Sequence, residues 1–217
     1  MSNNNKNILV VVAHPDDETF GMGGTINKHI NDGDKVFVIS MTNGVGSRKN
    51  ITEKKIKERE IAGNKASKIL GFTWHQRFDF PDNAMDKYPL IEYVKCIESS
   101  KEVINPSIVY THSAADLNID HRRIPEAVIT AFRPEPEEKC KEIRLFETLS
   151  ATDYSDPYLI GNFVPNLFIN IKNNWTNKLN ALESYAAELR NYPHTRSIKS
   201  IKNLAIRRGN QVGIEMA

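Results

Sequence analysis

Strand-length apolar runs alternate with helical patterns along this chain, and that alternation strongly limits the possible folds. Residues 7–13 (NILVVVA) form a continuous, mostly β-branched run, which is typical of a strand covered on both faces. Comparable runs occupy residues 35–42, 106–111, 143–150 and 166–171. Helical spacing occupies residues 19–32, 52–70, 90–102, 122–132 and 176–192. We therefore expect an α/β protein with a Rossmann-like, doubly wound, mostly parallel sheet and helices on both faces.

Length and composition are those of one compact domain. A chain of 217 residues without an internal repeat or linker predicts a single domain over residues 1–217. The net charge of +2 gives no argument for a nucleic-acid partner, and no apolar run reaches the length of a transmembrane helix. The first residues are polar and do not resemble a secretory signal. Cys96 and Cys140 lie outside any metal-binding spacing, so we expect reduced thiols and a cytoplasmic location.

Two polar clusters follow predicted strands, where ligands of open α/β sheets bind. His14 comes directly after the first strand, and His121 lies in the segment after the strand that ends near residue 111. With Asp17 they provide two imidazoles and one carboxylate, a set that leaves a coordination position open for water, as in catalytic zinc sites. We expect one Zn²⁺ per chain at this set, with the two segments meeting at the strand ends.

The neighbouring carboxylates have other expected roles. Asp16 would lie beside the metal without binding it and could act as the general base towards water. The alternative is that Asp16 or Asp17 only caps the helix that begins near Thr19. His14 ahead of the pair, and a second Asp-His pair further along, favour the metal site. Glu18 either supports a ligand or favours the helix N-terminus.

The two motifs also resemble a known family. AHPDDE (13–18) and DLNIDHR (116–122) are similar to motifs of the PIG-L/LmbE family of zinc-dependent N-acetyl-sugar deacetylases. GMGGTI (21–26), FPDNAMDKYPL (80–90) and LRNYPHTRS (189–197) follow in the family's order, so the resemblance covers nearly the whole chain. It implies a Rossmann-like α/β sandwich, in agreement with the pattern of strands and helices.

The resemblance implies particular roles at these positions. His14, Asp17 and His121 would be the zinc ligands, with Asp16 as the base and Asp120 as the acidic neighbour of the last ligand in the catalytic set.

One position departs from the family pattern. Many members carry a histidine, thought to stabilise the transition state, where this chain has Asn118. An asparagine amide can donate a hydrogen bond to an oxyanion but cannot protonate the leaving amine. Asp16 would then return the proton, or His112 would help, unless His112 is only structural.

Five residues are candidates for substrate binding, each with an ordinary surface, loop or strand-end role as the alternative: Arg59, His112, Arg133, His194 and Arg196. The glycine-rich FGMGGT (20–25) lacks the dinucleotide-binding pattern G-x-G-x-x-G, which disfavours a cofactor-binding Rossmann protein.

The predicted function is removal of an N-acetyl group from an amino sugar that is free, nucleotide-linked or carrier-linked, including lipid-linked. Alternatives are a metal-dependent amidase or deacylase acting on another N-acyl amine, and a catalytically silent sugar-binding relative. The resemblance also allows a homo-oligomer, because many relatives associate.

Overall fold

The computed structural model describes residues 5–48 and 51–217 and contains one five-stranded sheet. The strands are β1 (Asn7–Val12), β2 (Lys35–Thr42), β3 (Thr73–Phe80), β4 (Ile108–His112) and β5 (Glu142–Phe146). Their order in the sheet is β3-β2-β1-β4-β5, and every pair is parallel. This confirms the Rossmann-like prediction.

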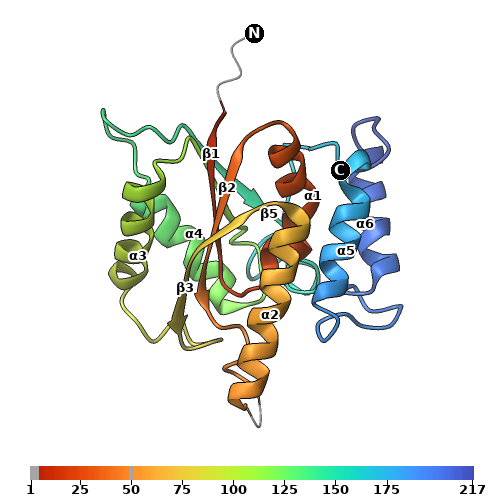
Figure 1. Ribbon diagram of the computed structural model, residues 1–217, viewed down its shortest axis with the longest axis horizontal. Helices are drawn as coiled ribbons and strands as arrows, with labels where there is room; N and C mark the ends of the chain where they lie inside the picture. The colour runs from red at the N-terminus through yellow and green to blue at the C-terminus, as the bar shows by residue number, and fades with distance from the viewer. Residues whose placement is uncertain (1–4, 49–50) are drawn as a thin grey trace.

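Helices cover both faces of the sheet (Figure 1). They are α1 (Asp17–Asn31), α2 (Glu53–Leu70), α3 (Leu90–Ile104), α4 (Ile119–Ala131), α5 (Trp175–Ser184) and α6 (Ile198–Asn210), with a short 3₁₀ turn η1 (Lys172–Asn174). Helices α3 and α4 pack on one face, and α1, α2, α5 and α6 lie on the other. No described helix combines the length and the apolar character needed to cross a membrane.

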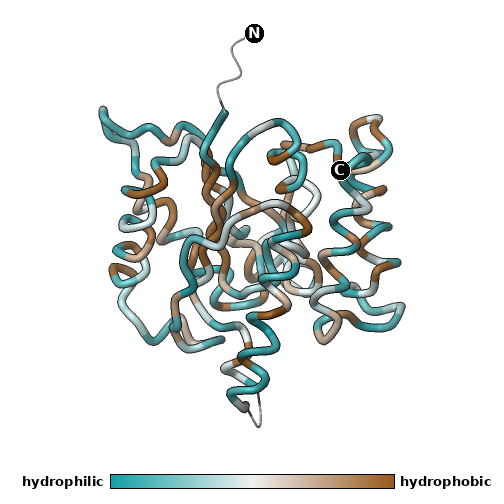
Figure 2. The backbone as a smooth tube through the Cα atoms, viewed as in Figure 1, coloured by the Kyte–Doolittle hydropathy of each residue, from teal (hydrophilic) through white to brown (hydrophobic). Residues whose placement is uncertain are grey.

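The central strand β1 explains why its sequence is apolar throughout. Ile8 and Val10 belong to the core on the α1 side, whereas Leu9 and Val11 belong to the core on the α3–α4 side. All four are 0% exposed. Burying each such side chain contributes about 1.5–3 kcal/mol. Figure 2 shows the hydrophobic segments along the central strands.

The strand order places a crevice beside the end of β1. Connections from β1 lead outward through β2 to β3, whereas β4 and β5 extend the other way, so the order reverses between β1 and β4. Ligands of doubly wound sheets bind outside the carboxyl ends of the strands at such a reversal. Both predicted polar clusters follow these two strands.

Some predicted elements were wrong. Residues 166–171 form no strand, because Ile169 and Ile171 pack with α6 residues and Met216 instead of extending the sheet. The late helix ends at Ser184 rather than continuing to residue 192. Strand β3 and helix α6 were not predicted.

Candidate metal and catalytic site

A tight turn joins β1 to α1 and brings His14 next to Asp17. The carbonyl of His14 accepts the N–H groups of Asp16 (3.0 Å) and Asp17 (3.3 Å). In return, Asp17 Oδ2 accepts the backbone N–H of His14 at 2.9 Å. The turn therefore fixes both side chains before the first turn of α1 is complete.

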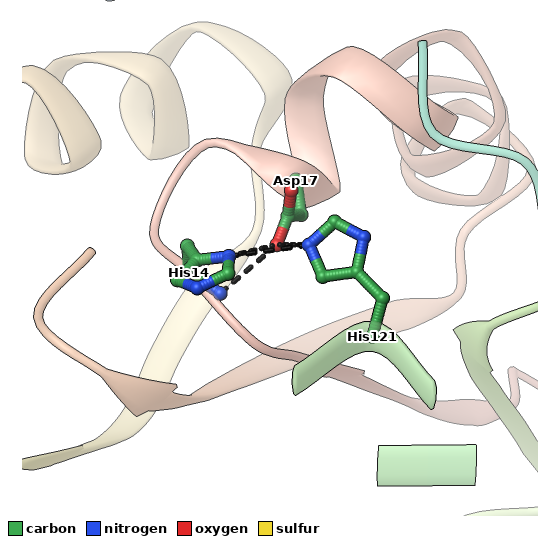
Figure 3. Close-up of side chains that lie close together, drawn as sticks. All are labelled: His14, Asp17 and His121. Carbon is green, nitrogen blue, oxygen red and sulfur yellow. Dashed lines mark hydrogen bonds and ion pairs between the residues drawn. The ribbon is translucent and has the colours of Figure 1, made fainter. Parts of the chain in front are cut away.

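His121, from the first turn of α4, completes a compact set with these two residues (Figure 3). His14 Nδ1 lies 3.2 Å from Asp17 Oδ2 and 3.2 Å from His121 Nε2. His121 Nε2 lies 3.3 Å from Asp17 Oδ2. Ligand atoms around a tetrahedral zinc with ordinary bond lengths are separated by about 3.3 Å. The three donor atoms therefore fit a zinc ion in both chemistry and spacing.

Carboxylates hold the outer nitrogen atoms of both imidazoles. His121 Nδ1 lies 3.0 Å from Asp116 Oδ2. His14 Nε2 lies 3.0 Å from Asp82 Oδ1 and 3.1 Å from Asp120 Oδ2. Such carboxylates orient metal-binding histidines and fix their tautomers. The sequence motifs did not assign this orienting role to Asp82 or Asp116.

Asp120 contacts His14, and its expected catalytic role stays a prediction. Asp120 is 0% exposed and lies behind His14. Its carboxylate also accepts the backbone N–H groups of Asn83 (2.7 Å) and Met85 (3.1 Å). With these contacts the carboxylate of Asp120 can orient His14.

The pKa values of Asp17 and His121 are shifted in opposite directions. Burial opposes protonation of His121, but Asp17 and Asp116 outweigh it and raise the pKa of His121 to about 9. Burial would raise the pKa of Asp17, yet His121 and His112 hold it well below its usual range. Metal binding at such a set displaces protons from the imidazoles.

Asp16 lines the same cavity as His14 but belongs to a different network. Its side chain makes no cap hydrogen bond to α1, which rules out the capping alternative for this residue. Asp16 Oδ2 lies 3.0 Å from Arg59 Nη1 and 3.5 Å from Arg196 Nη1. Burial raises the pKa of Asp16, and the charge of Arg59 opposes that rise. Asp16 is therefore a buried carboxylate with raised proton affinity.

Glu18 stabilises the turn between β1 and α1 through a hydrogen bond to its backbone. It is 0% exposed, and its Oε2 accepts the backbone N–H of Asp16 at 3.0 Å. Tyr185 donates its hydroxyl to Glu18 Oε1 at 2.9 Å. Burial raises the pKa of Glu18 to about 7.

Asn118 is the N-cap of α4 and also lines the cavity at the site. Its Oδ1 accepts the N–H of Asp120 at 2.8 Å, and its Nδ2 donates to Asn83 Oδ1 at 3.0 Å. Capping therefore uses the carbonyl oxygen of Asn118, and Asn83 accepts one of its two amide N–H groups, so one N–H remains for another partner.

His112 does not line the cavity, and its expected role in substrate binding stays a prediction. It is 0% exposed and its ring stacks on His121 with centroids 4.0 Å apart. Its Nε2 accepts the N–H of Ala13 at 3.0 Å. Burial and the charge of His121 lower the pKa of His112 to about 4, so this imidazole is neutral. It packs against the ring of His121 on the side of the β1 backbone.

Two other expected substrate contacts lie elsewhere. Arg133 follows the far end of α4, where it pairs with Glu98 and Glu135. A helix of 13 residues separates the two ends of α4 by about 20 Å, so Arg133 cannot reach the site. His194 does not line the cavity, and its Nδ1 accepts the N–H of Arg196.

The cavity itself is lined almost entirely by polar side chains. Its residues are His14, Asp16, Gly44, Ser47, Arg48, Arg59, Asp82, Asn83, Asn118, Glu188 and Arg196. Arg59 and Arg196 were predicted here, whereas Arg48 and Glu188 were not, because nothing in their local sequence marks them.

Fold and site together define a class of protein: a Rossmann-like α/β protein with a candidate metal set and an adjacent carboxylate at the end of its central strands. Residues 9–132 match the model of the PIG-L family, described as GlcNAc-PI de-N-acetylase. The chain belongs to this family, and this confirms the resemblance seen in the two motifs.

Individual relatives cover most of the chain. It is 25% identical over 194 residues to a probable N-acetyl-alpha-D-glucosaminyl L-malate deacetylase 2 of Bacillus anthracis, covering 85% of this chain and 82% of that one. The crystal structure of N,N'-diacetylchitobiose deacetylase from Pyrococcus horikoshii superposes with a TM-score of 0.77 at 20% identity, covering 98% and 82% of the two chains.

A third relative has another activity. GalB, the 4-carboxy-2-hydroxymuconate hydratase of Pseudomonas putida KT2440, has a TM-score of 0.71 at 24% identity, covering 95% of this chain and 87% of that one. The shared fold therefore does not determine the reaction.

Proposed function

We propose that this chain is a zinc-dependent deacetylase that hydrolyses the acetamide of an amino sugar, free or linked to a nucleotide or a carrier such as a lipid. The observation that carries the proposal is that Asp16 lines one cavity with His14 but stays outside the His14–Asp17–His121 set. Family membership and the activities named for the two deacetylase relatives support the same reaction.

His14, Asp17 and His121 would hold one zinc ion. When bound there, zinc supplies Lewis acidity that polarises the acetyl carbonyl and acidifies water. Asp16 takes a proton from the attacking water and returns it to the amine nitrogen as the carbon–nitrogen bond breaks. The amide N–H of Asn118 donates a hydrogen bond to the oxygen on which charge develops. Water and amide thus become acetate and a free amine.

The other cavity residues fit a hydroxyl-rich substrate. Arg59 and Arg196 are charged donors at the cavity wall, and Ser47 and Asn83 add hydroxyl and amide groups. We propose that Arg59 and Arg196, which already contact Asp16, also contact the sugar. A cytoplasmic location is also part of the proposal, supported by two free cysteines, Cys96 and Cys140.

Acetate release tests the proposal. Zinc-loaded protein is incubated with N-acetylglucosamine, its nucleotide-linked and lipid-linked forms, and the corresponding N-propionyl sugars. We expect acetate from at least one N-acetyl sugar and little hydrolysis of the bulkier acyl group. Asp16→Asn should lower kcat by roughly 10²- to 10⁴-fold, since a general base contributes about that factor, while zinc content stays unchanged.

Other results would contradict the deacetylase. Faster release of propionate than acetate would favour a deacylase of other N-acyl amines. Sugar binding by calorimetry without any turnover, equal in the wild type and Asp16→Asn, would favour a silent binding protein.

A further inference from the structure

Glu188 is a buried carboxylate that gathers three arginines at the cavity. It lies in the turn region after α5, outside the segment matched by the family model, and is 3% exposed. Arg48 Nη2 donates to both of its oxygens, at 2.7 and 2.8 Å. Arg59 Nη2 donates to Oε1, and Arg196 Nη1 lies 3.6 Å from Oε2. None of the proposed reaction steps uses this carboxylate.

Two of these arginines also face Asp16. Arg59 spans the two carboxylates, because its Nη1 lies 3.0 Å from Asp16 Oδ2 while its Nη2 binds Glu188. Arg196 Nη1 lies 3.5 Å from the same Asp16 oxygen. Both contacts go to Oδ2, and among the described residues no hydrogen bond to Oδ1 is found. Asp16 thus has one oxygen held by arginine and one oxygen free.

Glu188 shares the two arginines, Arg59 and Arg196, with Asp16, and its negative charge affects where they lie. Arg59, Asp16 and Glu188 are buried, Arg196 is partly buried, and Arg48 is exposed. A buried ion that loses its partner is strongly destabilised, and this applies most to Arg59. If the charge of Glu188 is removed, Asp16 is the remaining carboxylate partner of Arg59 and Arg196. Both guanidinium groups then gain by moving onto Asp16, including the oxygen that is free in the wild type.

We propose that Glu188 is a positioning residue of the deacetylation reaction, holding Arg59 and Arg196 to one oxygen of Asp16 and keeping the other oxygen open to water. The inference rests on the proposed function, because it assigns Asp16 the role of base. The competing explanation is that Glu188 only anchors the segment between α5 and α6 to α2, in which case its loss lowers stability alone.

Three variants separate these explanations. Glu188→Gln removes the charge and keeps the size, whereas Glu188→Asp keeps the charge. Glu147→Gln is the matched control, because Glu147 forms a comparable ion pair with Arg208, at 2.7 and 2.6 Å, away from the cavity at the site. For each protein, kcat and KM for acetate release, zinc content and thermal unfolding are measured with zinc-loaded full-length chain.

The positioning role predicts that Glu188→Gln lowers kcat by roughly 10- to 100-fold, as misplacement of a catalytic group does, and changes KM by a smaller factor through the displaced arginines. Zinc content should stay at the wild-type level, because Glu188 has no contact with His14, Asp17 or His121. Glu188→Asp should recover most of the lost kcat, and Glu147→Gln should keep the wild-type kcat whatever its stability.

An unchanged kcat in Glu188→Gln would overturn the positioning role, as would a loss of the same size in Glu188→Asp at wild-type stability. If Glu188→Gln unfolds at the assay temperature, kcat of all variants is compared at a lower temperature at which thermal unfolding shows it folded. Wild-type acetate release is measured first. Its absence contradicts the deacetylase function itself, whereas an active wild type with an equally active Glu188→Gln contradicts only the inference about Glu188.

Discussion

Asp16 and Asp17 are neighbours in the chain but have different partners. Asp17 faces His14 and His121, and the imidazoles of His121 and His112 hold its pKa well below the usual range. Asp16 faces Arg59 and Arg196 at the cavity wall, and burial raises its proton affinity. Two carboxylates whose surroundings shift their pKa values in opposite directions can divide the work of ligand and base. One tight turn thus provides both roles.

Asn118 combines a structural and a proposed chemical role that two substitutions can separate. Asn118→Ala removes the cap of α4 and should lower the free energy of unfolding by about 1 kcal/mol. Asn118→Ser keeps a capping oxygen without an amide, so its stability should stay near wild type. Both variants should lower kcat by roughly 10²-fold or more, because both lack the oxyanion donor. Denaturant unfolding and acetate release measure the two effects.

A wild-type kcat in Asn118→Ser would show that the amide has no part in the reaction. A wild-type stability in Asn118→Ala would show that the hydrogen bond to Asp120 contributes nothing as a cap.

At the scale of elements, the site is built from the first turns of two helices. Asp17 is the first residue of α1, and His121 is the third residue of α4. The N-terminus of a helix carries partial positive charge and favours nearby carboxylates, such as Asp17, Glu18 and Asp120. Both helices follow strands that flank the reversal in the sheet order, so the sheet fixes the distance between the two first turns.

The contact between α5 and α1 predicts a pH dependence of stability. Lys178 of α5 is 6% exposed, and its stem packs where Gly23 of α1 leaves room. Burial lowers the pKa of Lys178 from 10.5 to about 8, although Glu147 opposes the shift. Between about pH 8 and 10.5 the unfolded chain therefore binds more protons at this residue, and its contribution to the unfolding free energy rises with pH.

Lys178→Met should remove that contribution. We expect the variant to be more stable than wild type at pH 7 by up to about 3 kcal/mol, with the difference shrinking as pH approaches 10.5. Urea unfolding at pH 7, 8.5 and 10 measures it, with Lys202→Met on the exposed face of α6 as control. If the unfolding free energies of wild type and Lys178→Met change equally with pH, Lys178 does not have the lowered pKa of a buried amine.

At the scale of the whole molecule, the first two thirds of the chain was the more predictable part. Fully buried strands such as β1 have unbroken apolar sequences, and the two motifs follow them directly. β3 was missed because it is a half-buried edge strand of mixed sequence, TWHQRFDF. The segment at 166–171 has a strand-like sequence, but its apolar residues pack against α6 and Met216.

The site was predictable where ligand chemistry leaves a local pattern, and not where long-range packing supplies a residue. His14, Asp17 and His121 come together because the sheet order brings their segments to one crevice. Glu188 reaches that crevice through the packing of α5 against α1 and α2, which no spacing in the sequence shows. Arg133 was a candidate for substrate binding with an ordinary helix-end role as the alternative, and the length of α4 places it far from the crevice.

The central claim is that His14, Asp17 and His121 hold one zinc ion, and the metal content of the purified protein tests it most directly. Wild type and His121→Ala are loaded with zinc, dialysed and analysed by mass spectrometry for metal per chain. The account predicts about one zinc per chain in the wild type and loss of that zinc in a folded His121→Ala, because the site needs three protein ligands. A wild-type protein that stays free of metal after zinc is supplied, or a variant that keeps its zinc, would contradict it.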